Sequence, residues 1–286
     1  FISIAVPALT FFLLTAVGLD LTRDDFVRVR RQWAVVCAGL VAPIVLLPPI
    51  ALGLIWAFQP APEVAAGLLL VAACPIGGIS NTYSYLARAS TALSVTLTGL
   101  SSLFASVTIP AIGRGLELSL GRPFELAAPI PLLLGQLVLT LGLPVALGMW
   151  IRHRRPDIAE RHRPALQRLA FGGIAVVLLL VIVADPQAFV GGLNTTVPLA
   201  AVFVVISALA GWMTASMLTR DRNDRFTLAA EFGTRNVAVA TTIAVTLLGR
   251  VEFARFATTY FLTELPLMLV AVALFRRGGS GRPIAR

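Results

Sequence analysis

Long uncharged stretches follow one another along almost the whole chain, separated by short polar connections. About 20 consecutive apolar residues are enough for a helix to cross the hydrocarbon core of a bilayer. The sequence therefore predicts an all-α polytopic membrane protein with its longest polar loop near 152–168. Nine spans are expected, at residues 5–21, 33–58, 63–87, 93–113, 127–151, 169–184, 197–218, 226–248 and 256–275.

The composition excludes several classes of protein. Of the 286 residues, 57% are hydrophobic and 13% are charged, against about 25% charged in soluble domains, so no room remains for a soluble catalytic or nucleic-acid-binding domain. All basic residues are Arg, and a Walker-type phosphate loop requires Lys. Cys37 and Cys74 have no metal-site spacing, and His153 and His162 lie in the predicted polar loop, where solvent is their expected surrounding. We expect neither an enzyme nor a cofactor.

The net charge of +9 describes topology rather than a nucleic-acid partner. Alternate connections carry 18 arginines and the opposite connections carry four, namely Arg114, Arg122, Arg250 and Arg255. The positive-inside rule puts the 18 in the cytoplasm. The C-terminus is then cytoplasmic and residue 1 lies outside, in a plasma membrane of the bacterial inner-membrane type. One arginine, Arg235, lies inside a predicted span.

Two spans are interrupted by small and polar residues, at 75–81 and at 231–236. Paired broken helices at matching positions of inverted repeats mark the midplane site of many transporters, and polar backbone at membrane depth must line a cavity or be buried. Shifting the first half by about 160 residues pairs all spans except 127–151. We expect one transporter domain over 1–286, with repeat 1 at about 1–115 lacking its first helix and repeat 2 at about 127–276, from a parent of ten spans.

The residues at these breaks form recognisable motifs. The first reads Cys-Pro-Ile-Gly-Gly-Ile-Ser-Asn at 74–81, followed by Tyr-Leu-Ala at 85–87 and Leu-Ser-Val at 93–95; the second reads Glu-Phe-Gly-Thr-Arg-Asn at 231–236. In these motifs, and across the whole chain, the sequence resembles the bile acid:sodium symporter family of the bile/arsenite/riboflavin transporter superfamily. The resemblance implies a ten-span transporter in which two broken helices cross.

Oxygen-bearing side chains cluster around the breaks. Ser94 and Thr98 are four residues apart and share a helix face. With Ser80, Asn81 and Glu231, they offer several hard oxygen ligands and one negative charge, which suit a dehydrated sodium ion. A row of Ser and Thr residues alone more often serves helix packing. The presence of the acid Glu231 in the same region is what favours a cation-binding site. The resemblance places the family's first sodium site on these five positions.

The family's second sodium site does not carry over, because its two Gln ligands correspond here to Arg235 and Pro43. A guanidinium cannot coordinate a cation, but it can stand in place of one, offering positive charge to Glu231 or to a substrate anion. An unpaired Arg in a membrane is costly, so we expect Arg235 to pair with Glu231, with Glu264 in the next span, or with both. Arg235, Asn236 and Glu264 are the expected substrate or coupling residues, with one sodium ion or none per substrate.

The leading hypothesis is a secondary active transporter that carries a bile-acid-like or other organic carboxylate with Na⁺, by alternating access. The alternative is a proton-coupled carrier or an arsenite-type efflux permease in which Glu231 and Glu264 titrate, since the Glu264 segment also resembles the last helix of arsenite permeases. A channel or a non-transporting receptor is the third hypothesis. The expected partners are the bilayer, a small organic anion and Na⁺ or H⁺, without nucleic acid.

The charge asymmetry predicts an orientation that labelling can test. In a variant with Cys37 and Cys74 replaced by Ala, Asn194→Cys should react with a membrane-impermeant maleimide added to intact cells. His162→Cys should react only after the cells are lysed, because its connection is cytoplasmic. The reverse pattern would overturn the orientation.

Overall fold

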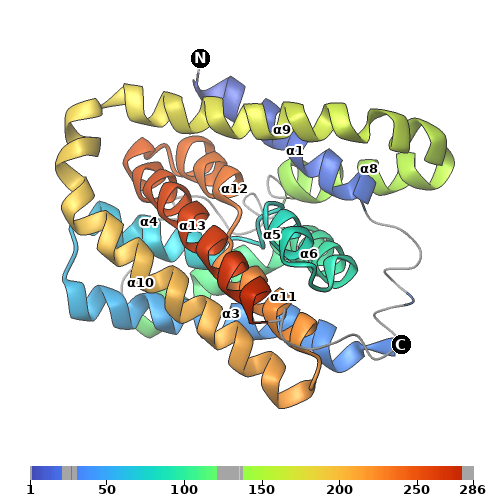
Figure 1. Ribbon diagram of the computed structural model, residues 1–286. Helices are drawn as coiled ribbons and strands as arrows, with labels where there is room; N and C mark the ends of the chain where they lie inside the picture. Colours follow the sequence, from blue (N-terminus) through green and yellow to red (C-terminus); the bar gives the residue numbers. More distant parts are fainter. Residues whose placement is uncertain (1, 21–26, 28–30, 121–134, 136–137, 279–286) are drawn as a thin grey trace.

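The computed structural model describes residues 2–20, 27, 31–120, 135 and 138–278, and these form helices joined by short connections (Figure 1). The elements are α1 (Ile2–Asp20), α3 (Trp33–Phe58), α4 (Pro62–Ala73), α5 (Ser80–Ala87), α6 (Thr91–Leu120), the π-helical turn η1 (Val138–Gly142), α8 (Leu143–Arg154), α9 (Pro156–Ala184), α10 (Pro186–Leu218), α11 (Arg222–Gly233), α12 (Val237–Thr242), the π-helical turn η2 (Ile243–Leu247) and α13 (Val251–Arg277).

Four of the described helices are long and apolar enough to cross a membrane: Trp33–Phe58, Thr91–Gly113, Phe189–Leu218 and Val251–Arg277. Three shorter apolar helices accompany them, at Thr10–Asp20, Pro62–Ala73 and Val237–Leu247. These helices confirm the all-α membrane class. Nine spans and the inverted repeat remain predictions, and residues 127–134 and 136–137 of the expected span at 127–151 lie outside the described residues.

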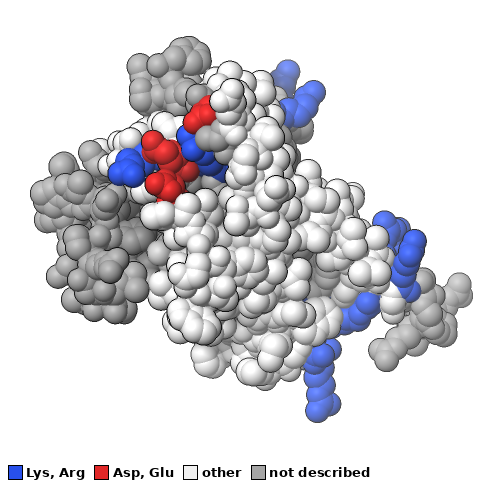
Figure 2. Space-filling model, turned by 90° about the vertical axis from the view of Figure 1, so that its left-hand side faces the viewer, with Lys and Arg blue, Asp and Glu red and all other residues white. Residues whose placement is uncertain are grey.

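The outer surface is apolar, as expected where lipid replaces water. Large hydrophobic side chains on α3 and α10 are exposed, including Trp33, Val45, Trp56, Leu209 and Met217. Figure 2 shows one face on which a broad area free of Asp, Glu, Lys and Arg separates a mixed charged group from arginines at another edge. This arrangement suits a protein that meets hydrocarbon on its sides and water at its ends.

Two groups of helices pack around the broken segments (Figure 1). In the first, α1 packs against α8 and α9. Gly18 and Gly148 let α1 and α8 approach closely, because a Cβ on either glycine would lie 2.2 Å from a carbonyl oxygen of the other helix. In the second group, α10 packs against α3, α11 and α13.

The polar segment at 152–168 is helical, so its prediction as a loop was wrong. Helix α8 continues to Arg154, and α9 begins at Pro156. Proline is favoured at a helix start because its missing N–H would have no partner there, and Arg, Glu, Ala and Leu are good helix formers. His153 and His162 are exposed, as expected.

Candidate functional site

The two interrupted segments meet in the interior and pair with each other. Ile76 and Arg235 form an isolated antiparallel β-bridge. The Gly77 amide donates to the Thr234 carbonyl at 3.1 Å, and the Asn236 amide donates to the Pro75 carbonyl at 2.9 Å. Each break therefore satisfies backbone groups that the other break leaves without helical partners, which is required at membrane depth.

The sequence explains why the chain breaks here. Helix α4 ends before Pro75, because proline disfavours helical backbone in the residue before it. Gly77 is needed for the close approach, since a Cβ there would lie 2.7 Å from the Arg235 carbonyl oxygen. Asn236 accepts a hydrogen bond from the Val239 amide at 3.1 Å and so caps α12.

All five expected sodium ligands lie together beside the crossing. Ser94 Oγ donates to Glu231 Oε1 and lies 2.8 Å from Asn81 Oδ1. Thr98 Oγ1 lies 3.1 Å from Glu231 Oε2 and 3.3 Å from Asn81 Oδ1. Ser80 Oγ is 3.3 Å from Thr98 Oγ1. The cluster thus joins α5, α6 and α11.

The cluster is mostly buried and carries one acid. Ser80, Ser94 and Glu231 are fully buried, Thr98 is 1% exposed, and Asn81 is half-buried. Six side-chain oxygens converge there, which is a hard donor set of the kind alkali and alkaline-earth cations prefer. A single carboxylate among neutral hydroxyl and amide oxygens suits a small monovalent cation.

Neighbouring residues support the cluster in ways that the sequence did not reveal. Ser101, three residues after Thr98, accepts from the Ile76 amide and donates to the Thr98 carbonyl, both at 3.1 Å. Tyr260 donates to the Gly233 carbonyl at 2.6 Å, at the end of α11. Both anchor backbone at a break, and a lone Ser or Tyr in an apolar span gives no signal of such a partner.

Glu264 lies outside the oxygen cluster. It is 1% exposed, and Thr234 donates to its Oε1 at 2.9 Å. It therefore stands beside the second break, on α13, rather than with Glu231. The structure brings Glu264 close to the crossing without making it part of the oxygen cluster.

Arg235 does not form the expected ion pair. Its Nη2 donates to the Cys74 carbonyl, and among the described residues no salt bridge links it to Glu231 or Glu264. That prediction was wrong because the bridge with Ile76 fixes the backbone of Arg235, while Glu231 and Glu264 accept from hydroxyl groups instead. The side chain is only 5% exposed.

Two cavities border Arg235. The first, of about 250 Å³, lies between α1, the first break and α12, and its polar lining includes Asn81, Asn236 and Asp20. The second, of about 260 Å³, lies between α3, the first break and α6, and Pro43 lines it together with Arg235. The two positions that depart from the family pattern therefore share one cavity.

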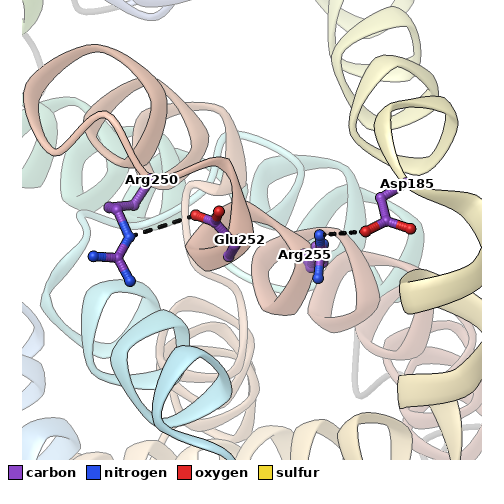
Figure 3. A network of polar contacts seen from close by, with 4 residues as sticks. All are labelled: Asp185, Arg250, Glu252 and Arg255. Atoms are coloured by element: carbon purple, nitrogen blue, oxygen red, sulfur yellow. Dashed lines mark hydrogen bonds and ion pairs between the residues drawn. The ribbon is translucent and has the colours of Figure 1, made fainter.

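A separate polar network joins α13 to the connection between α9 and α10 (Figure 3). Arg255 binds Asp185 at 2.8 Å, and Arg250 lies 3.6 Å from Glu252. All four side chains are partly exposed, so these pairs contribute little to stability. The Arg255–Asp185 pair joins α13 to this connection, the Arg250–Glu252 pair is local to the start of α13, and neither belongs to the buried cluster.

Comparison with known proteins identifies the family of the chain. Residues 6–191 match the sodium bile acid symporter family. The chain is 29% identical over 249 residues to an uncharacterized sodium-dependent transporter, YocS, of Bacillus subtilis, covering 82% of this chain and 73% of the relative. It is 26% identical to a mouse sodium-dependent organic anion transporter (94% and 74% covered) and 28% identical to a probable rice chloroplast sodium/metabolite cotransporter, BASS2 (82% and 54%).

The crossing predicts unequal effects at two adjacent glycines. Gly77→Ala should destabilise the purified protein by about 1–3 kcal/mol, because the added methyl group meets the Arg235 backbone. The loss should appear as a lower Tm. Gly78→Ala is the matched control, since its Cβ would meet only Val17 Cγ2 at 3.8 Å. Equal thermal stability of the two variants would contradict the close approach.

Proposed function

Since the chain belongs to the sodium bile acid symporter family, we propose that it carries an organic anion across the membrane together with Na⁺ bound at the oxygen cluster. The family is one of transporters, so the protein is a multi-pass membrane transporter and not an enzyme. The observation that carries the proposal is one cluster in which Ser94 and Thr98 donate to the buried carboxylate of Glu231 while Ser80 and Asn81 contact these two hydroxyl groups.

The charge of the cluster supports a cation. A buried carboxylate without a positive partner is costly, and hydroxyl groups alone only partly compensate it. A sodium ion would neutralise Glu231 while the hydroxyl and amide oxygens replace the water that the ion loses. Two relatives are named as sodium-dependent transporters, and for this reason we assign the cation as Na⁺ rather than another monovalent ion.

Coupling follows from the position of the cluster. Glu231 and Ser94 are 137 residues apart in sequence and meet only because the two breaks cross. Bound Na⁺ would hold α5, α6 and α11 together, and Asn81 belongs both to the cluster and to the lining of the first cavity. Cation binding would thereby shape the cavity that receives the substrate, which alternating access requires.

One sodium ion per substrate is the proposed stoichiometry. Where the family pattern implies a second cation site, Arg235 and Pro43 line one cavity, and neither can coordinate a cation. The fixed charge of Arg235 takes the place of a second ion. The proposal also includes the positive-inside orientation and a location in the bacterial inner membrane. It further includes two inverted repeats of five spans each in the parent protein.

A proton-coupled carrier remains the second candidate because of Glu264. Its carboxyl group is 1% exposed and accepts from Thr234, so it could carry a proton between the two sides. In that case the Tm of the protein would change with pH at constant Na⁺.

Replacing Glu231 should remove sodium binding. Na⁺, but not the same concentration of choline chloride, should raise the Tm of the wild-type protein, because a ligand stabilises the state that binds it. In Glu231→Gln the apparent sodium affinity should fall at least about ten-fold, roughly 1.4 kcal/mol, since the only acid of the cluster is gone.

Two further variants complete this experiment. Glu252→Gln, at a partly exposed acid of α13 that lies outside the cluster, should keep the wild-type sodium response. Glu264→Gln should also respond to Na⁺ if Glu264 lies outside the cation site. A Glu231→Gln variant that folds and retains the full sodium response would refute the site, and a Tm that depends on pH and not on Na⁺ would favour proton coupling.

A further inference from the structure

A second set of polar contacts joins α6 to α11, at the start of both helices. Ser90 Oγ donates to Asp224 Oδ1, and the Ser90 amide donates to Thr227 Oγ1 at 3.1 Å. Asp224 is 5% exposed and Thr227 is fully buried. Two side chains of α11 therefore hold one residue at the beginning of α6, at some distance from the oxygen cluster.

Ser90 is well placed to control the position of α6. It stands directly before this helix, and the Ser94 amide donates to the Ser90 carbonyl at 3.0 Å, so Ser90 is the cap residue of α6. Only residues 88–90 connect α5, which ends at Ala87, to α6, which begins at Thr91. Holding Ser90 consequently restrains both helices, and these carry four of the five residues of the oxygen cluster.

The contacts of Ser90 lie in line with those of the cluster. On α11, Asp224 and Glu231 are seven residues apart, close to two helical turns, so they face the same side of the helix. Ser90, Ser94 and Thr98 follow one another at intervals of four residues. The contacts advance along both helices in the same direction, from Asp224 with Ser90 to Glu231 with Ser94 and Thr98. One row of polar contacts thus runs from the helix starts to the cluster.

This row defines the register of α6 against α11 more sharply than the apolar contacts do. Leu93, Leu97 and Leu228 are fully buried in one hydrophobic cluster, but hydrophobic contact is non-directional, whereas a hydrogen bond depends on distance and angle. A slip of one residue would move a side chain about 1.5 Å along the helix axis and turn it by roughly 100°. Such a slip would separate the hydroxyl groups of α6 from Glu231.

The oxygen cluster lies between two anchors. On one side Ile76 pairs with Arg235 at the crossing, and on the other side Ser90 is held by α11. Between them, Ser94 and Thr98 donate to different oxygens of one carboxylate, Oε1 and Oε2. A binding site works only when its ligands are held within about 0.5 Å of the required geometry, so the anchor at Ser90 bears directly on cation binding.

We propose that Asp224 is a positioning residue for cation binding, which acts through Ser90 to keep α6 in the register where Ser94 and Thr98 meet Glu231. This inference rests on the proposed function, because the cation at the oxygen cluster is taken to be Na⁺. Asp224 itself does not contact the ion. It fixes the side chains that do, as residues behind the ligands of a metal site commonly do.

The test measures the apparent Na⁺ affinity of the purified full chain from the rise of its Tm with Na⁺, at constant ionic strength in choline chloride. Asp224→Ala and Ser90→Ala should each weaken this affinity by about ten-fold. In the double variant the two losses should not add, because both substitutions remove the same contact. The preference for Na⁺ over Li⁺ should also fall, since a displaced set of ligands no longer fits one ionic radius.

Asp224→Asn separates position from charge. The amide Oδ1 of Asn can still accept from Ser90, so the apparent Na⁺ affinity should stay within about three-fold of the wild-type value. If Asp224 instead attracted the cation through its negative charge, Asp224→Asn would lose as much affinity as Asp224→Ala. That result would overturn the positioning role.

Asp221 provides a matched control on the same helix. It is an exposed acid that caps α11, where its side chain accepts from the Asn223 amide at 2.7 Å. Asp221→Ala should lower the Tm without Na⁺, because the helix loses its cap, and should leave the Na⁺ affinity and the preference over Li⁺ unchanged. A Na⁺ affinity that falls with Tm in every variant, Asp221→Ala included, would indicate a structural effect alone and contradict the inference.

The remaining outcomes separate this inference from the proposed function. If the wild type responds to Na⁺ and both Asp224→Ala and Ser90→Ala bind Na⁺ as tightly, the positioning role is refuted and the sodium site stands. Additive losses in the double variant would refute the action of Asp224 through Ser90. If the wild type does not respond to Na⁺, the sodium site and the positioning role fail together.

Discussion

Backbone amides and carbonyls at membrane depth must find partners inside the protein, and this constraint organises the whole molecule. Two helices break, and the hydrogen bonds that each break lacks are made by the other, through Gly77 and Thr234 and through Pro75 and Asn236. The same crossing brings Glu231 to Ser94 and Thr98. The cluster of oxygens around one buried acid is therefore a consequence of how the broken backbone is satisfied.

Much of the site could be predicted from the sequence, because small polar residues and an acid inside apolar spans are conspicuous. Ser80, Asn81, Ser94, Thr98 and Glu231 were expected together, and the structure brings all five together. Their binding of sodium stays a proposal. The span count, the repeat and the orientation also remain predictions, since part of the chain lies outside the described residues.

Other features depend on tertiary contacts that local pattern does not encode. Charge alone suggested that Arg235 pairs with Glu231 or Glu264, whereas hydroxyl groups occupy both acids and Arg235 donates to the Cys74 carbonyl. Polarity suggested a loop at 152–168, although its residues favour helix and Pro156 starts one. The anchoring role of Ser101 follows from the position of the other break.

The central claim is that the crossing holds one mobile cation beside one fixed positive charge. Its most direct test is the effect of membrane voltage on the accumulation of a transported carboxylate by proteoliposomes with a fixed Na⁺ gradient. One Na⁺ per monoanion moves no net charge, so the accumulation ratio should not change with voltage. Two sodium ions would carry one net charge, and a tenfold rise in accumulation for each 59 mV or so of inside-negative potential would contradict the account.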